Sequence, residues 1–183
     1  LGSIKSSSLT INGVSSSKTI LTKGTIDATS DLTFNYLKVD GMSINNKGGV
    51  AATDSIFNFA DSTYKLGTVN SYNLTIIGQS ALKTILNGRK ITVSTLLTIK
   101  NIALNKIPIS NYGNIAASNT IFDSSSSSTY GGAIYSTGTS AHIDLNNCTF
   151  SNNHAAYGGA IYMVDGILDI RNSVFTNNYA TYY

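Results

Sequence analysis

Short triplets of the form apolar, polar, apolar recur along the whole chain, and a second triplet follows each after a few polar residues. The first triplets begin at Leu9, Leu32, Val50, Leu74, Leu97, Ile115, Ile143 and Leu168. Alternation with a period of two and many β-branched side chains is typical of a short strand with one buried face. No stretch has the spacing of an amphipathic helix. The pattern therefore predicts eight rungs of short strands and no helix.

A third triplet is visible in many turns, for example Met42-Ser-Ile44 and Ala160-Ile-Tyr162. Successive first triplets begin 18 to 28 residues apart, which is enough for three short strands and their corners. The sequence therefore predicts an all-β fold, a parallel β-helix of about eight coils in which each strand pairs with its equivalents above and below. We expect a right-handed coil, the usual sense of parallel crossovers.

The chain also repeats itself over a longer interval. Residues 9–57 align without a gap to residues 74–122, with 19 identities in 49 positions. Self-similarity at a fixed period is the sequence signature of a solenoid. We interpret this shift of 65 residues as three coils, so that Leu9 and Leu74 are expected on the same face. Residues 1–183 are then expected to form a single β-helix segment of a longer chain.

Asparagine and aspartate recur at the corner between the first and second triplets. This position holds Asp54, Asn101, Asn119, Asn147 and Asn172. Asn tolerates the left-handed backbone of a sharp corner, and stacked amides can hydrogen-bond along the axis. We therefore expect a structural Asn ladder, interrupted at Tyr36, rather than a ligand site.

Composition and charge narrow the classes of partner. Ser, Thr and Asn make up 66 of the 183 residues, Glu is absent and the net charge is +3, which is too small to indicate nucleic-acid binding. No apolar run is long enough for a membrane span. Residues 1–106 carry eleven Lys or Arg against five Asp, whereas the remainder is slightly acidic. This asymmetry allows head-to-tail self-association, and an end-to-end filament subunit is one alternative function.

Two sequence motifs near the end of the chain resemble known repeats. Tyr130-Gly-Gly-Ala-Ile-Tyr135 and Tyr157-Gly-Gly-Ala-Ile-Tyr162 alternate with Phe150-Ser-Asn-Asn153 and Phe175-Thr-Asn-Asn178. This alternation of GGAI with FxxN resembles the repeats of chlamydial polymorphic outer-membrane proteins. The looser rungs are similar to those of adhesin-like surface proteins of methanogenic archaea. The resemblance implies an extracellular, cell-surface β-helix that serves as a stalk or adhesin, without catalytic residues or a cofactor.

Tyrosines precede the glycine pairs at equivalent positions. Tyr130, Tyr157 and Tyr182 are expected to form an aromatic stripe along the solenoid. Such a stripe can stack against the rings of surface glycans, or it can simply cover a turn. The glycine pairs themselves are expected to allow a positive φ and a close approach of adjacent coils.

Parallel β-helices also include polysaccharide-cleaving enzymes, which need carboxylates gathered on one outer face. Asp144 and Asp169 are the best candidates, because both are expected to point outward one rung apart, with Arg171 nearby. They could hold a cation weakly or act as an acid/base pair, but such a pair is more often a solvated surface. We expect no catalysis and no bound metal.

Two further surface features remain open. Thr residues at the centres of several first triplets would suit an ice-binding face, although Thr is also favoured on exposed strands. Asn73-Leu-Thr75 and Asn147-Cys-Thr149 match the glycosylation pattern. Asn73 is expected to be the better acceptor, because Asn147 should be shielded in the ladder.

Overall fold

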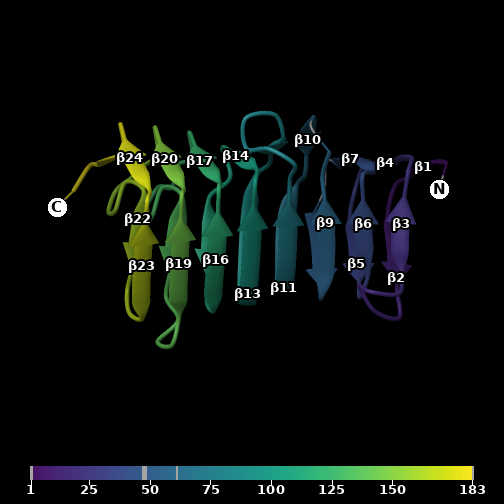
Figure 1. The fold of residues 1–183 in the computed structure, drawn as a ribbon, viewed down its shortest axis with the longest axis horizontal. Helices are drawn as coiled ribbons and strands as arrows, with labels where there is room; N and C mark the ends of the chain where they lie inside the picture. Colours follow the sequence, from purple (N-terminus) through teal and green to yellow (C-terminus); the bar gives the residue numbers. More distant parts are fainter. Residues whose placement is uncertain (1, 47–48, 61, 183) are drawn as a thin grey trace.

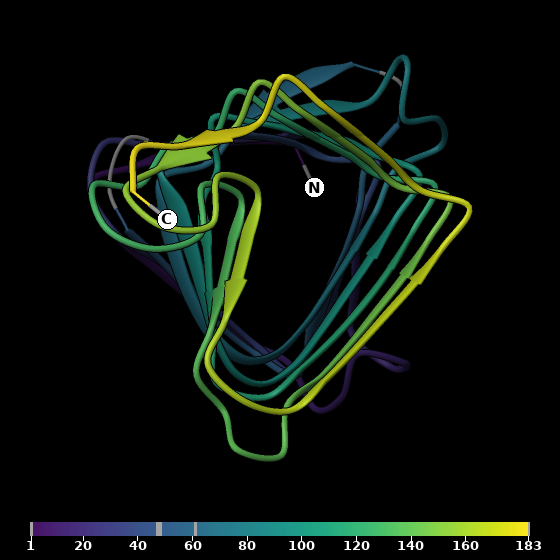
Figure 2. The same cartoon turned by 90° about the vertical axis from the view of Figure 1, so that its left-hand side faces the viewer.

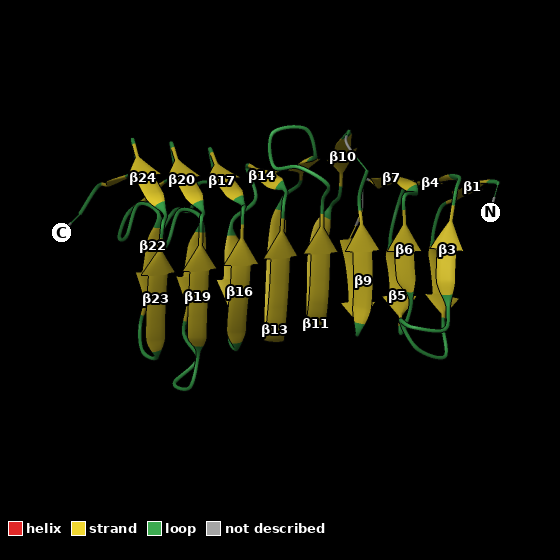
Figure 3. Cartoon of the chain, in the orientation of Figure 1, coloured by secondary structure: helices red, strands yellow, loops and turns green. Residues whose placement is uncertain are grey.

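The chain winds around one long axis as a solenoid. The computed structural model describes residues 2–46, 49–60 and 62–182, and every regular element in these ranges is a β-strand (Figure 3). The first and last coils lie at opposite ends of the rod (Figure 1). Viewed along the axis, the coils superpose on a triangle, and the chain runs counterclockwise toward the C-terminal end (Figure 2). The predicted right-handed parallel β-helix is therefore confirmed.

Strands in equivalent positions stack in parallel and form three faces, named here in their order along a coil. Face 1 contains β2 (Leu9–Asn12), β5 (Leu32–Asn35), β8 (Gly49–Thr53), the first half of β11 (Thr68–Ile77), the first half of β13 (Lys90–Lys100), β15 (Ile109–Asn111), β18 (Ile134–Ser136) and β22 (Ile161–Met163). Face 2 contains β3 (Ile20–Thr22), β6 (Lys38–Asp40), β9 (Ser55–Asn58), the second halves of β11 and β13, β16 (Asn114–Ser118), β19 (His142–Asn146) and β23 (Ile167–Arg171).

Face 3 forms a sheet of its own. It contains β1 (Ser3–Ser6), β4 (Thr25–Ala28), β7 (Ser43–Asn46), β10 (Thr63–Lys65), β12 (Ile85–Asn87), β14 (Ala103–Asn105), β17 (Ile121–Asp123), β20 (Thr149–Ser151) and β24 (Val174–Thr176). A short pair, β21 (His154–Ala155) with β25 (Tyr179–Ala180), lies between faces 3 and 1. Faces 1 and 2 are continuous, because β11 and β13 pass through the corner between them.

The core is a column of apolar side chains inside the triangle. Alternation along each strand turns every second residue inward, so Ile143 and Leu145 of β19 are fully buried while Asp144 between them is not. Aromatic rings stack along the axis beneath face 3: the Phe122 and Phe150 ring centroids are 4.4 Å apart, and those of Phe150 and Phe175 are 4.7 Å apart. Like residues in successive coils thus pack on one another, which makes the core continuous from coil to coil.

The interpretation of the 65-residue repeat as three coils is wrong. Leu32 pairs in register with Val50 on face 1, and Val50 pairs in turn with Val69 rather than with Leu74. Leu74 lies on face 2, where its partner is Leu97. The repeat therefore spans three coils and one additional strand, and the second copy is rotated by one face relative to the first.

Two equivalent loops make this rotation visible. In the first copy, the Val14 amide donates to Thr19 Oγ1 at 3.0 Å, at the corner between faces 1 and 2. In the second, the Gln79 amide donates to Thr84 Oγ1 at 3.2 Å, at the corner between faces 2 and 3. The two loops project from different corners in Figure 2, one in purple and one in blue-green. The same local sequence therefore folds into the same turn on either corner.

Candidate functional site

The three tyrosines of the predicted aromatic stripe lie in one column between faces 3 and 1. The ring centroids of Tyr130 and Tyr157 are 5.5 Å apart, and those of Tyr157 and Tyr182 are also 5.5 Å apart. A parallel bridge between Tyr130 and Tyr157 sets their backbones one coil apart. The three side chains are partly exposed, so the rings form a stack that is open to the surface.

Two further tyrosines belong to the same surface and were missed in the sequence. Tyr135 of β18 and Tyr162 of β22 pair in register on face 1, and both lie against Tyr130, with ring centroids 5.4 Å and 4.6 Å away. The signal was present, because alternation in β18 buries Ile134 and Ser136 and turns Tyr135 outward. We call Tyr130, Tyr135, Tyr157, Tyr162 and Tyr182 the tyrosine cluster.

The glycine pairs position this cluster. Gly131 and Gly158 have φ values of 56° and 63°, in the left-handed region that glycine adopts without a steric penalty. A Cβ on Gly132 would lie 2.0 Å from the carbonyl oxygen of Gly159 in the next coil. The pairs thus turn the backbone and let neighbouring coils approach closely at this point.

A groove of about 360 Å³ adjoins the tyrosine cluster. Its lining combines aromatic and ring side chains with hydroxyl groups: Pro108, Tyr112, Ser126, Ser127, Tyr130 and Tyr135. Tyr112, which also lines the groove, is 55% exposed. Flat apolar rings beside hydroxyl donors and acceptors are the chemistry that binds a sugar, whose ring has apolar faces and a polar rim.

The two candidate carboxylates lie together, as their spacing suggested, but each has a cationic or imidazole partner. Asp144 and Asp169 pair in register on the outer side of face 2. Arg171 donates to Asp144, and His142 Nε2 lies 2.7 Å from Asp169 Oδ2. No cluster of three or more metal-ligating side chains occurs in residues 2–46, 49–60 and 62–182. One oxygen of each carboxylate is thus engaged by a neighbouring side chain.

Three members of the predicted Asn ladder hydrogen-bond in series at the corner between faces 2 and 3. Asn119 Nδ2 donates to Asn101 Oδ1 at 3.0 Å, and Asn147 Nδ2 donates to Asn119 Oδ1 at 2.8 Å. All three have a positive φ, as does Asn172. Asn172 instead donates to the neighbouring Asn146 at 3.3 Å. The ladder is therefore shorter than predicted.

Asp54 does not belong to this ladder. It lies at the corner between faces 1 and 2, together with Tyr36, because the rotation of the repeat places it on a different edge. Its Oδ1 accepts a hydrogen bond of 2.6 Å from Nδ2 of Asn73, the expected glycosylation site. Asn73 is half-buried, whereas Asn147 is exposed rather than shielded.

The chain resembles a known repeat in its C-terminal part. A family model described as the Chlamydia polymorphic membrane protein repeat matches residues 147–163, which run from the FxxN motif to the second GGAI motif. No curated protein and no solved structure matches the chain. The repeat match and the solenoid together indicate a surface- or outer-membrane-associated β-helix protein. The described part of the chain contains no helix that could cross a membrane.

Proposed function

We propose that this β-helix is a non-catalytic, extracellular module of a cell-surface protein that holds surface glycans against its tyrosine cluster. The observation that carries the proposal is the stack of partly exposed tyrosines beside a groove with a hydroxyl-rich wall. The matched repeat supports a location at the cell surface, where a protein can meet glycans.

Rigidity favours binding by this surface. Tyr135 and Tyr162 are fixed by strands of face 1, and Tyr130 and Tyr157 by the glycine turns. Aromatic side chains held in place before binding lose little conformational entropy when a ligand stacks on them. Coils spaced about 4.8 Å apart repeat these rings along the axis, which suits an extended chain of sugars.

The arrangement of charged groups supports a module that binds without cleaving. Cleavage of a glycosidic bond needs one carboxyl group as acid and a second as base or nucleophile. Asp144 and Asp169 are instead paired with Arg171 and His142, on face 2 and away from the tyrosine cluster. We therefore propose that these residues form a surface network of one ion pair and one hydrogen bond.

A glycan array with the purified chain tests this function. The wild-type chain is expected to retain a limited set of glycans intact, and Tyr130→Ala is expected to weaken retention about fivefold, since an aromatic contact contributes about 1 kcal/mol. Tyr72→Ala is the matched control, because Tyr72 is 64% exposed and lies at the corner between faces 1 and 2. Equal binding by Tyr130→Ala and the wild type, or release of shortened sugars, would contradict the proposal.

A further inference from the structure

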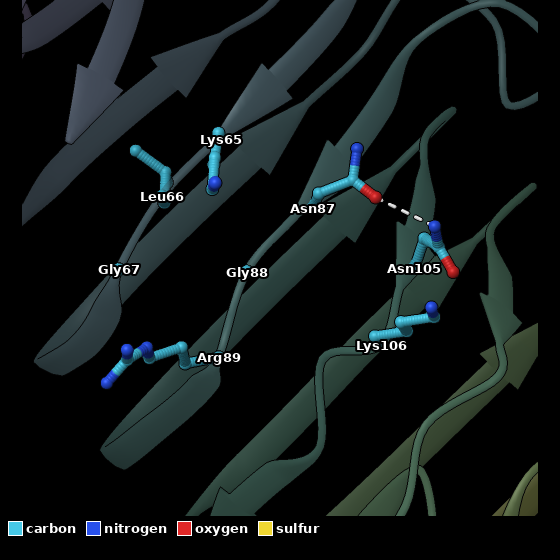
Figure 4. Close-up of a pocket in the computed structure, with 8 residues that line it drawn as sticks. All are labelled: Lys65, Leu66, Gly67, Asn87, Gly88, Arg89, Asn105 and Lys106. Atoms are coloured by element: carbon cyan, nitrogen blue, oxygen red, sulfur yellow. Dashed lines mark hydrogen bonds between the residues drawn. The ribbon is translucent and has the colours of Figure 1, made fainter. Parts of the chain in front are cut away.

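A second groove lies on the same corner of the solenoid, between faces 3 and 1, and its charged side chains are all basic. It has a volume of about 350 Å³ and spans three successive coils (Figure 4). The first coil contributes Lys65, Leu66 and Gly67, the second Asn87, Gly88 and Arg89, and the third Asn105 and Lys106. We call this the basic groove.

Among the residues that the structure describes, no acidic side chain forms an ion pair with the cations of the basic groove. Lys65, Arg89 and Lys106 are exposed, and none of them forms an ion pair within the described part of the chain. Asp123 follows Asn105 in the register of face 3, but its carboxylate accepts hydrogen bonds from other side chains, including Ser151 at 2.5 Å. The described lining of the groove therefore presents three positive charges to a ligand.

Lys106 occupies a backbone position that disfavours lysine. Its φ is 58°, and the same corner in the following coils holds Ser124, Asn152 and Asn177, all with a similar left-handed φ. Asn adopts this conformation more readily than a residue with a long aliphatic side chain. A strained residue at a surface hollow points to a role for its side chain, here for its charge.

Neutral groups in the basic groove suit the hydroxyl groups of a sugar. Asn105 Nδ2 donates to Asn87 Oδ1 at 2.7 Å, which leaves the Asn87 amide hydrogens and Asn105 Oδ1 available to hydroxyl groups (Figure 4). No aromatic side chain lines the basic groove itself, so a ligand is held there through its charges and hydroxyl groups.

The basic groove adjoins the groove of the tyrosine cluster. Arg89 lines the basic groove, and the next residue, Lys90, lines the groove of the tyrosine cluster. Likewise, Lys106 lines the basic groove and Pro108 lines the other. A ligand that follows the rod axis along this corner would pass from the cationic side chains to the tyrosines.

We propose that the basic groove binds the acidic groups of a linear anionic polysaccharide, whose ring faces stack on the adjoining tyrosine cluster. Cations supplied by coils about 4.8 Å apart suit a polymer that carries negative charges at regular intervals. This inference rests on the proposed function, because it names the class of glycan that the same corner takes.

Two substitutions with the same chemistry test the inference. Lys106→Asn removes one positive charge and relieves the backbone strain of a lysine in the left-handed conformation. Lys23→Asn makes the same change at a φ of 52°, in a corner remote from the groove. The probes are a tetragalacturonide and its fully methyl-esterified form, measured by calorimetry at low and high salt. Lys106→Asn is expected to bind the acid two- to fivefold more weakly, as for an exposed ion pair, with unchanged ester binding and an equal or higher melting temperature. Lys23→Asn is expected to bind both probes like the wild type.

The outcomes separate this inference from the proposed function. Two results would contradict anion binding by the basic groove and leave the proposed glycan binding intact. One is equal affinity of the wild type for the tetragalacturonide and its methyl ester, and the other is equal tetragalacturonide binding by Lys106→Asn and Lys23→Asn. Acid binding that is lost in Lys65→Gln/Arg89→Gln but unaffected by Tyr130→Ala would instead remove the tyrosine cluster from the site. Inorganic phosphate that competes as strongly as the tetragalacturonide would also overturn the inference, since it would reduce the groove to a simple anion site.

Discussion

At the scale of single residues, the corners of the solenoid impose the strictest requirement. Asn101, Asn119 and Asn147 combine a left-handed backbone with an amide that bonds to the next coil. The sequence pattern identified this role because Asn is one of the few residues that meets both demands. The pattern did not identify Lys106 and Ser124, which occupy corners of the same kind, because neither residue type is associated with this conformation.

Tyr36→Asn is expected to stabilise the protein. Tyr36 has a φ of 54° and is 45% exposed, so the substitution relieves backbone strain but gives up the packing of the covered half of the ring. The expected gain is about 0.5–1 kcal/mol, part of the cost of a left-handed non-glycine residue. Urea unfolding measures it through the midpoint, and a lower midpoint than that of the wild type would show that the Tyr36 ring contributes packing which outweighs the strain.

The stability of the protein is expected to fall in acid, in part through Asp123. Burial alone would raise the pKa of the Asp123 carboxyl group, but hydrogen bonds from Ser151, Asn152 and Ser124 outweigh it and lower that pKa. Because the pKa of this group is lower in the folded state than in the unfolded state, the ionised carboxylate stabilises the fold above about pH 4. This contribution is lost as the pH falls through the pKa of the folded state.

Urea midpoints at pH 7 and pH 3 measure this effect. Asp123→Asn should lower the midpoint at pH 7 and reduce the difference between the two pH values. A variant that keeps the full pH dependence of the wild type would show that other carboxyl groups, such as Asp40, account for it.

At the scale of elements, the sequence predicted the strands but not which of them stack. Triplets on all three faces consist of similar apolar residues, so the pattern contains no label for the face. Val69-Asn-Ser71 lacks an apolar third residue and so does not match the rung pattern, whereas Leu74-Thr-Ile76, which begins after two further residues of the same strand, matches it. The basic groove could not be predicted for the same reason, because only the stacking of the coils brings Lys65, Arg89 and Lys106 together.

The phenylalanine column beneath face 3 is expected to be the element most sensitive to truncation. Phe150 is fully buried between Phe122 and Phe175, so Phe150→Ala should lower the free energy of unfolding by about 3–5 kcal/mol through lost contacts and a cavity. Phe175→Ala is the matched control with a smaller loss, because Phe175 is 43% exposed. Equal losses in urea unfolding would show that the ring stack does not determine the cost.

At the scale of the whole molecule, stability is a property of neighbouring coils rather than of one central core. Each coil pairs only with the coils on either side, as in other quasi-one-dimensional folds. Burial is uneven along the axis: Ile91, Leu97 and Ile99 of β13 are enclosed, whereas Leu9 and Ile11 of β2 are only partly buried.

Hydrogen exchange is expected to follow this gradient. Amides of β11 and β13 should exchange slowest, because their coils are enclosed on both sides. Amides of the outermost coils, in β2 and β3 and in β23 and β24, should exchange fastest, since local opening there exposes little additional apolar area. Exchange monitored by mass spectrometry of proteolytic fragments measures the order. Uniform protection from β2 to β19 would indicate that the solenoid opens as one unit.

The rotated repeat has a consequence for how such a shaft diversifies. The loop that ends at Thr19 and its copy that ends at Thr84 show that a duplicated stretch can re-enter the stack on another side without losing its local geometry. Outward-facing residues copied with that stretch then point to a different side of the solenoid. Growth of the chain by duplication would in this way wrap a recognition surface around the shaft instead of extending it along a single edge.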